Sequence, residues 1–209
     1  MDWMSIALEK TRFTQMLIDE NGLDRKGFDG WVFCPGMPFN SLEKWWGDHG
    51  RRAYPHEGVD FCLYRDHAGQ TRRLDKTSRI PAMHDGVLKA VFTDYLGEAL
   101  IIEHDNPTGD DHRFLSIYAH TRPLTGVDIG TVIKKGDIIA TLADTVGSKS
   151  GIIPHLHFSL GIPAPFFSYD PFTWKTIQTP EMITLLDPLQ IIDGSSHTLE
   201  SANSFCRAL

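Results

Sequence analysis

The stretch "IIPHLHFSL", residues 152–160, places His155 and His157 one residue apart in a run that is otherwise typical of a buried strand. Side chains at positions i and i+2 of a strand lie on the same face, about 6.5 to 7 Å apart. Either both imidazoles bind one metal ion, or one binds it and the other works beside it. The alternative is a pair of core histidines that are hydrogen-bonded to their neighbours, so the pair needs partners elsewhere before it indicates chemistry.

The strand-like pattern continues on the N-terminal side of this stretch. Residues 59–162 contain short apolar or alternating runs separated by turns, among them "VDFCLY", "ALIIEH", "FLSIYAH" and "TVIKKGDIIATLA". Several short strands at such spacing predict an antiparallel sandwich or barrel. Lys135, Gly136 and Asp137 separate two of the runs, and the glycine suits the positive φ of a hairpin turn. We therefore expect a mostly β protein with a small antiparallel β-sandwich or barrel-like core.

The segments on either side of this core have a different composition. Residues 3–20 have helix-forming composition followed by an Asn-Gly stop signal, which predicts an N-terminal helix. Residues 27–55 are rich in Gly, Pro, Asn and aromatic residues without a clear period, which predicts an irregular extension. "PEMITLLDPLQII", residues 180–192, predicts a short helix or turn that stops before Pro188. The chain is thus divided into an N-terminal helix and extension, a core and a C-terminal extension: 1–52, 53–162 and 163–209.

Composition narrows the class of function. The 209 residues carry a formal net charge of −7 and show no basic stripe, which argues against a nucleic-acid partner. No run of about 18 apolar residues predicts a membrane span, and the N-terminus "MDWMSIALEKTRF" shows no export signal. Cys34, Cys62 and Cys206 are too few for a disulfide scaffold. They allow one bridge, for which Cys34 and Cys62 are the candidate pair, although spacing does not determine it.

Two other segments offer partners for the histidine pair. In "YPHEGVDF", residues 54–61, proline and glycine favour a turn into a strand that can fold His56 back towards Asp60. Together with one histidine of "HLH" they form a set of two imidazoles and one carboxylate, which leaves a tetrahedral zinc ion one open position, as in catalytic sites. The second partner is His120, at the end of "FLSIYAHT". A histidine there is either a surface residue or a group that exchanges protons beside the metal.

Three motifs in this order, "HEGVDF", "IYAH" and "PHLHFSL", resemble the signature motifs of the LytM/lysostaphin-type zinc endopeptidases. The resemblance covers roughly residues 53–162, about half of the chain. It implies metal-assisted peptide hydrolysis within a mostly antiparallel β-sandwich or barrel-like fold. By the same resemblance Tyr118 packs or hydrogen-bonds near the site. The implied site residues are zinc ligands and a catalytic pair that activates water and stabilises the tetrahedral intermediate: His56, Asp60 and His157 for Zn²⁺, and His120 and His155 for catalysis.

The resemblance also implies a substrate and a location. The family's usual substrates are the peptide stems or cross-links of bacterial peptidoglycan, so we expect peptidoglycan peptides as partners. We expect the protein to work in the cell envelope, for example the periplasm, or outside the cell. The alternative is a latent or non-catalytic zinc-binding module of the same fold that regulates cell-wall enzymes. Such modules normally lack ligands, and here none is missing, so turnover decides between the two.

Three features depart from the family pattern. Residues 61–80 form a longer stretch than a minimal member needs, which predicts an added cleft wall that narrows substrate choice. "SKSGIIPHLHF" has "IIP" where the family often has a glycine-rich turn. The N-terminal extension raises the alternative of a covered cleft, with Asn40 or Glu43 in contact with zinc.

Structural or surface roles are expected for the remaining histidines: His49, His67, His84, His104, His112 and His197.

Overall fold

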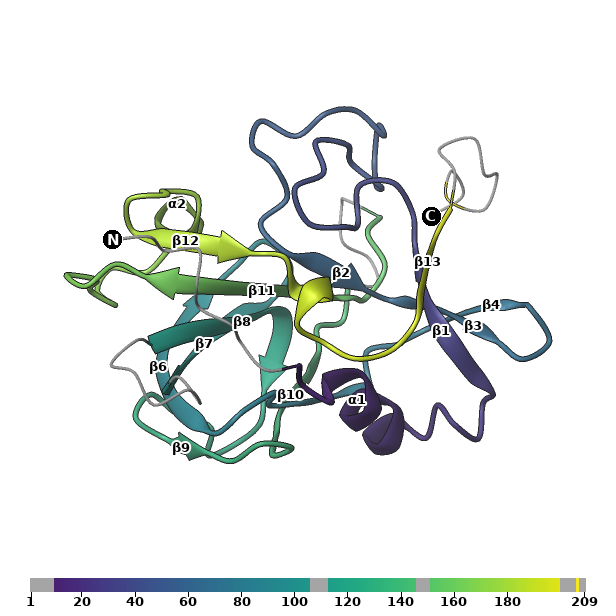
Figure 1. Ribbon diagram of the computed structural model, residues 1–209, viewed down its shortest axis with the longest axis horizontal. Coiled ribbons are helices and arrows are strands. Elements are labelled where there is room, and N and C mark those ends of the chain that lie inside the picture. The colour runs from purple at the N-terminus through teal and green to yellow at the C-terminus, as the bar shows by residue number, and fades with distance from the viewer. Residues whose placement is uncertain (1–9, 106–112, 146–150, 200–205, 207–209) are drawn as a thin grey trace.

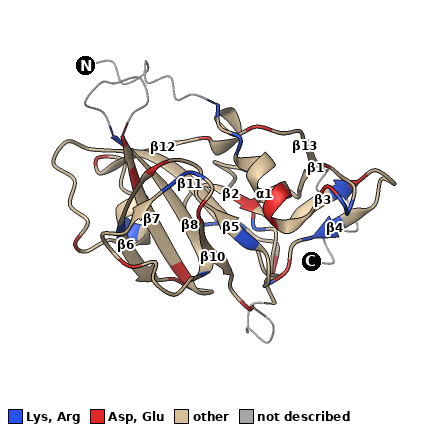
Figure 2. Ribbon diagram, turned by 90° about the horizontal axis from the view of Figure 1, so that it is seen from below, with Lys and Arg blue, Asp and Glu red and all other residues tan. Residues whose placement is uncertain are grey.

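A computed structural model of the protein describes residues 10–105, 113–145, 151–199 and 206 (Figure 1). Its main elements are a nine-stranded sheet, a four-stranded sheet and the helix α1 (Phe13–Asn21). The expected mostly β fold with an antiparallel core is confirmed. Acidic and basic segments are interspersed over both sheets (Figure 2).

The nine-stranded sheet carries the predicted core, and all of its strand pairs are antiparallel. Its central strand β8 lies between β7 and β11, and its C-terminal end also pairs with β10. In order along the sheet, the strands are β12 (Ile183–Leu186), β11 (Leu156–Pro163), β8 (Arg113–Pro123), β7 (Glu98–Asp105), β6 (Gly86–Thr93) and β9 (Val132–Ile133), with β10 (Ile138–Leu142) on β8 and β5 (Arg79–Pro81), and β2 (Val59–Phe61) on β11.

Strand β11 is buried along its whole length because both of its faces are covered. Leu156, Phe158 and Leu160 point into the main hydrophobic core, where Phe158 stacks on Phe13 of α1 with ring centroids 4.7 Å apart. Residues between them in the sequence face the opposite side of the sheet, because side chains alternate along a strand. The continuous apolar run is thus explained, and His157 lies on the face away from the main core.

The four-stranded sheet joins parts of the chain that are distant in sequence. Its order is β13 (Ser196–Thr198), β1 (Phe28–Phe33), β3 (Leu63–Asp66) and β4 (Thr71–Arg73). Because β13 runs parallel to β1, with Phe33 opposite Thr198, the C-terminal tail passes beside Cys34. Cys34 forms a disulfide with Cys206 at a Cα–Cα distance of 5.6 Å, whereas Cys62 is free and buried. The candidate pairing of Cys34 with Cys62 was therefore wrong.

The predicted N-terminal helix begins later than expected. Residues 3–9 lie outside the described residues, and Thr11 forms a bridge with Ile192 instead of a helical turn, so α1 begins at Phe13. It ends before Gly22, whose left-handed conformation (φ 56°) caps it as the stop signal predicted.

Two other local predictions were wrong, one about strand pairing and one about the type of element. The Lys-Gly-Asp turn exists, with the Asp137 N–H bonded to the Lys134 carbonyl at 2.9 Å, but it does not close a hairpin. Its flanking strands pair elsewhere, β9 with β6 and β10 with β5 and β8. Residues 183–186 are the strand β12 rather than a helix, because they complete the edge of β11; a 3₁₀ turn, η2 (Pro188–Gln190), follows.

The segment between β11 and β12 contains the short helix α2 (Trp174–Ile177), which the sequence did not predict. It covers a smaller apolar cluster on the face of the sheet away from the main core, together with Phe172 and Ile183. Within the described parts of the chain, no helix is long and apolar enough to cross a membrane.

Candidate metal centre and cleft

The candidate metal ligands meet where β2 pairs with the start of β11. In that pair His157 lies opposite Asp60, so the strand register places two of the three groups. His56 precedes β2 in a turn that passes close to β11, since a Cβ atom at Gly58 would lie 2.2 Å from the carbonyl oxygen of Phe158. Glycine permits this approach. The turn thereby brings His56 beside the other two residues.

The ligand atoms of these three residues face one another in the interior. Asp60 Oδ1 lies 3.0 Å from His157 Nδ1 and 3.2 Å from His56 Nε2, and the two ring nitrogens lie 3.0 Å apart. The donors of a tetrahedral zinc ion, with bonds of about 2.0–2.1 Å, are about 3.4 Å apart. All three side chains are buried. The donor set and its spacing therefore fit zinc with small shifts.

Each imidazole of this set is oriented by a bond from its other nitrogen. His56 Nδ1 donates to the carbonyl oxygen of Pro38 at 3.1 Å. Because a carbonyl only accepts, Nε2 is left unprotonated and can bind a metal. His157 Nε2 lies 2.9 Å from Ser159 Oγ, which leaves Nδ1 directed at Asp60. Outer hydrogen bonds of this kind fix the tautomer and orientation of metal-binding histidines.

The second oxygen of Asp60 is held by the N-terminal extension. Asp60 Oδ2 accepts a hydrogen bond from Trp45 Nε1 at 2.6 Å, and Arg52 Nη2 lies 3.7 Å from the same oxygen. Burial opposes ionisation of this carboxyl, but the nearby imidazoles of His56 and His155 and the hydrogen bonds keep its pKa well below the usual value. The group is therefore a carboxylate, as a metal ligand must be.

His155 and His120 lie beside the ligand cluster. His155 Nδ1 donates to the carbonyl oxygen of Ile153 at 2.9 Å, and its Nε2 lies 3.9 Å from Asp60 Oδ1. Burial lowers the pKa of His155 to about 3, although Asp60 acts in the opposite direction. His120 comes from the neighbouring strand β8, and its ring centroid lies 4.7 Å from that of His155 and 5.8 Å from that of His157.

His120 is held by a carboxylate in the turn between β6 and β7. Asp94 Oδ2 accepts from the backbone N–H of His120 at 2.7 Å and lies 3.1 Å from its Nδ1. His120 has a positive φ of 60°, which is uncommon for a residue other than glycine and concentrates at functional sites. Burial opposes ionisation of Asp94, but the hydrogen bonds and charge of His120 outweigh it and lower the pKa of the carboxyl. The ring of His120 thus presents Nε2 away from Asp94.

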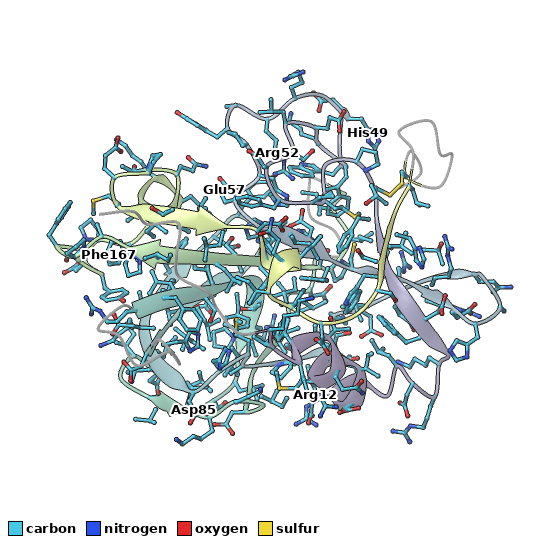
Figure 3. All side chains as sticks on the ribbon, in the orientation of Figure 1. Arg12, His49, Arg52, Glu57, Asp85 and Phe167 are labelled. Atoms are coloured by element: carbon cyan, nitrogen blue, oxygen red, sulfur yellow. A yellow bond between two sulfur atoms is a disulfide. The ribbon has the colours of Figure 1, made fainter. Side chains whose placement is uncertain are left out.

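The cleft over these residues has walls from three parts of the chain. The N-terminal extension contributes Trp46 and Arg52, the β6–β7 turn contributes Tyr95, and α2 with the residue after it contributes Trp174 and Gln178. Arg52 stacks over the Trp46 ring at 4.4 Å, and the Gln178 amide donates to the Glu57 carboxylate. Arg52 and Glu57 lie on the loop that leads to β2, close to each other in the view of Figure 3. Elements from both extensions therefore line the cleft.

Several expectations about the surroundings of the site were wrong. Residues 61–80 contribute β3 and β4 to the four-stranded sheet and none of the residues that line the cleft. Asn40 and Glu43 are exposed and are not among the clustered ligands. The expectation for Tyr118 agrees with the structure: the residue is buried behind the site, where its hydroxyl accepts from the Met83 N–H at 2.8 Å and its ring packs on Phe158.

The five site residues of the sequence analysis do come together, but the residues that support them were missed. Asp94 had a weak signal, since it is an acidic residue in a polar turn, "TDYLGE", between two predicted strands. Trp45 and Trp174 had none, because aromatic residues in irregular segments also serve as packing anchors.

Comparison with known proteins matches part of the chain to a protein family. Residues 65–164 match the model of Peptidase family M23, a range that includes "IYAH" and "PHLHFSL" and begins after "HEGVDF". No curated protein matches the chain.

Among solved structures, the chain is similar to the solution structure of lysostaphin, with 18% identity and a TM-score of 0.44 over 76% of this chain and 55% of that one. It is similar to the catalytic domain of lysostaphin from Staphylococcus simulans, with 18% identity and a TM-score of 0.40 over 78% of this chain and 86% of that one. It is also similar to a zinc containing peptidase from Vibrio cholerae, with 22% identity and a TM-score of 0.41 over 65% of this chain and 37% of that one. The chain thus spans about half of the full lysostaphin structure. Residues 65–164, nearly half of the chain, thus match Peptidase family M23, in agreement with the resemblance of "IYAH" and "PHLHFSL" to the LytM/lysostaphin-type endopeptidases.

Proposed function

We propose that this protein is a zinc-dependent endopeptidase that hydrolyses peptide bonds of bacterial peptidoglycan. The observation that carries the proposal is the meeting of two sets of groups in one cleft. Three buried donors, His56, Asp60 and His157, converge within 4.8 Å of one another. Two further imidazoles, His120 and His155, lie beside them and line the same cleft. Three protein ligands leave a tetrahedral ion one open position, which is the arrangement of catalytic zinc sites.

When bound by His56, Asp60 and His157, zinc would supply a Lewis acid for the scissile carbonyl and lower the pKa of a water molecule to about 7. The two other histidines handle the proton. His155 donates from Nδ1 to a carbonyl, so its Nε2 is free to accept a proton from the attacking water. Asp94 Oδ2 lies 3.1 Å from Nδ1 of His120 and orients the ring, so that Nε2 of His120 can act on the proton or on the developing oxyanion.

The location that we propose is the cell envelope or the extracellular space. Peptidoglycan is found there, and the Cys34–Cys206 disulfide supports an oxidising compartment.

The test is mass spectrometry of cross-linked peptidoglycan fragments after incubation with the zinc-loaded protein. New termini are expected with the intact protein and absent after chelation. His157→Ala should lose tight zinc binding, whereas His120→Ala should keep zinc and lose turnover. Normal turnover by His120→Ala would contradict its catalytic role. No cleavage by a protein that does bind zinc would instead favour the latent or regulatory module.

A further inference from the structure

The N-terminal segment formed by residues 35–52 contacts the metal centre although it lies outside the part of the chain that matches the family model. Two of its contacts reach Asp60 itself. The backbone N–H of Asp60 donates to the carbonyl oxygen of Met37 at 3.0 Å, and Trp45 Nε1 donates to Asp60 Oδ2 at 2.6 Å. The segment therefore holds both the main chain and the side chain of a candidate zinc ligand.

The two carboxylate oxygens of Asp60 have different partners. Oδ1 faces His56 and His157, whereas Oδ2 faces Trp45 and Arg52. The indole of Trp45 is 1% exposed and has one donor, so the bond defines a single rotation of the carboxylate. Without that donor, the buried Oδ2 would lose its hydrogen bond, and the carboxylate could rotate away from the metal position.

The segment is itself tied down, as an orienting element must be. Arg52 Nη2 donates to the Gly36 carbonyl at 2.8 Å and Nε to the Glu43 carbonyl at 3.0 Å, which closes the segment into a loop. Its start is fixed by the disulfide between Cys34 and Cys206. Gly36 packs against the backbone at Glu43 and Trp45, at distances that leave no room for a Cβ atom.

We infer that residues 35–52 orient Asp60 for metal binding and that Trp45 is the positioning residue that sets the zinc affinity of the site. The inference rests on the proposed zinc site and adds to it an element from outside the family-matched region. Outer partners of metal ligands typically contribute 10- to 100-fold to metal affinity.

The experiment compares the zinc affinity of single Trp→Phe variants by competition with a chromophoric chelator. Trp45→Phe should bind zinc about 10- to 100-fold more weakly than the wild type. Trp31→Phe is the matched control, because Trp31 is equally buried and its indole donates to Thr14 Oγ1 at 3.1 Å, away from the site. This control should bind zinc with an affinity close to that of the wild type.

Two further measurements keep the test decisive. The visible spectrum of the Co²⁺-loaded Trp45→Phe protein should differ from that of the wild type, since the geometry around the ion changes. If thermal unfolding shows that Trp45→Phe does not fold, Arg52→Met replaces it, because it removes the other group near Oδ2; weaker zinc binding is expected. If the folded Trp45→Phe protein binds zinc as tightly as the wild type, the inference about residues 35–52 is wrong, while the proposed zinc site stands. The same holds for Arg52→Met where that variant replaces Trp45→Phe. A wild-type protein that binds no zinc overturns the proposed zinc site as well.

Discussion

At the scale of single residues, a substitution of Asp94 tests the orientation of His120 without changing any of the candidate metal ligands. Asp94→Asn keeps the size of the side chain but removes the charge that faces Nδ1 of His120. We expect a fall in kcat of about 10- to 100-fold with little change in KM and with unchanged zinc content, because a positioned acid or base contributes about 10²- to 10⁴-fold. Steady-state kinetics and metal analysis check this, and ¹⁵N NMR of the imidazole should show a changed tautomer.

Asp144→Asn is a suitable control, since Asp144 pairs with Lys76 and is not among the residues that line the cleft. A changed NMR tautomer with unchanged kcat would show that Asp94 orients His120 but that this orientation does not limit the reaction. An unchanged tautomer and unchanged kcat would remove any role for Asp94.

The residues that carry chemistry could be predicted only where the sequence places them in short motifs. Alternation along a strand predicted one face for His155 and His157; in the structure β11 begins at Leu156, and His155 lies directly before it but still lines the same cleft as His157. The turn at Gly58 accounts for His56 and Asp60. Trp45 and Asp94 reach the site through tertiary structure, from a loop without a period and from a turn between strands. No local spacing could have assigned them.

At the scale of elements, the metal centre depends on how closely the turn before β2 approaches β11. Gly58→Ala would place a methyl group 2.2 Å from the Phe158 carbonyl oxygen, so the two strands must separate. We expect the free energy of unfolding to fall by about 2–4 kcal/mol and zinc affinity to fall with it, because backbone cannot yield as a flexible side chain does. Denaturant unfolding and chelator competition measure the two effects.

The matched glycine is Gly126, where a Cβ atom would meet nothing within 4 Å and only the left-handed φ of 86° opposes substitution. Gly126→Ala should cost about 1 kcal/mol and leave zinc affinity unchanged. Equal losses in both variants would mean that the close contact at Gly58 has no special role.

Strand existence was easier to predict than strand pairing. The short apolar or alternating runs of β6, β7 and β8 predict strands: burial alternates along β6, whereas the middle of β7 and of β8 is buried on both faces. The partners of β9 and β10 depend on sheet closure, which a turn such as Lys-Gly-Asp does not encode. The strand β12 likewise exists because β11 offers an unpaired edge.

At the scale of the whole molecule, the disulfide joins the end of β1 to the C-terminal segment across a sequence separation of 172. The double variant Cys34→Ser/Cys206→Ser should lose about 2–5 kcal/mol of unfolding free energy, since the bridge restricts the unfolded chain. Denaturant unfolding measures the loss. Cys62→Ser controls for substitution of a buried cysteine that is not bonded. A double variant as stable as the wild type would show that the β1–β13 pairing alone holds the tail.

The stability of the whole protein in acid should depend on His104, which lies in the sheet away from the metal ligands. His104 is 1% exposed, its Nδ1 donates to the Asp85 carbonyl at 2.7 Å and its Nε2 lies 2.6 Å from Ser116 Oγ, so the neutral ring is fully bonded. Burial lowers its pKa from 6.5 to about 4, although the bond to Asp85 acts in the opposite direction. The unfolded chain therefore binds a proton at a higher pH than the folded one.

It follows that the contribution of His104 is complete above about pH 6.5 and is lost progressively as the pH falls towards 4, by up to about 3 kcal/mol. His104→Gln removes the titrating group. The difference in unfolding free energy between wild type and variant, measured from pH 7 to pH 4, should shrink as the pH falls, while the acidic residues common to both cancel. A difference that stays constant over this range would mean that the ring is charged, or not protected, in the folded protein.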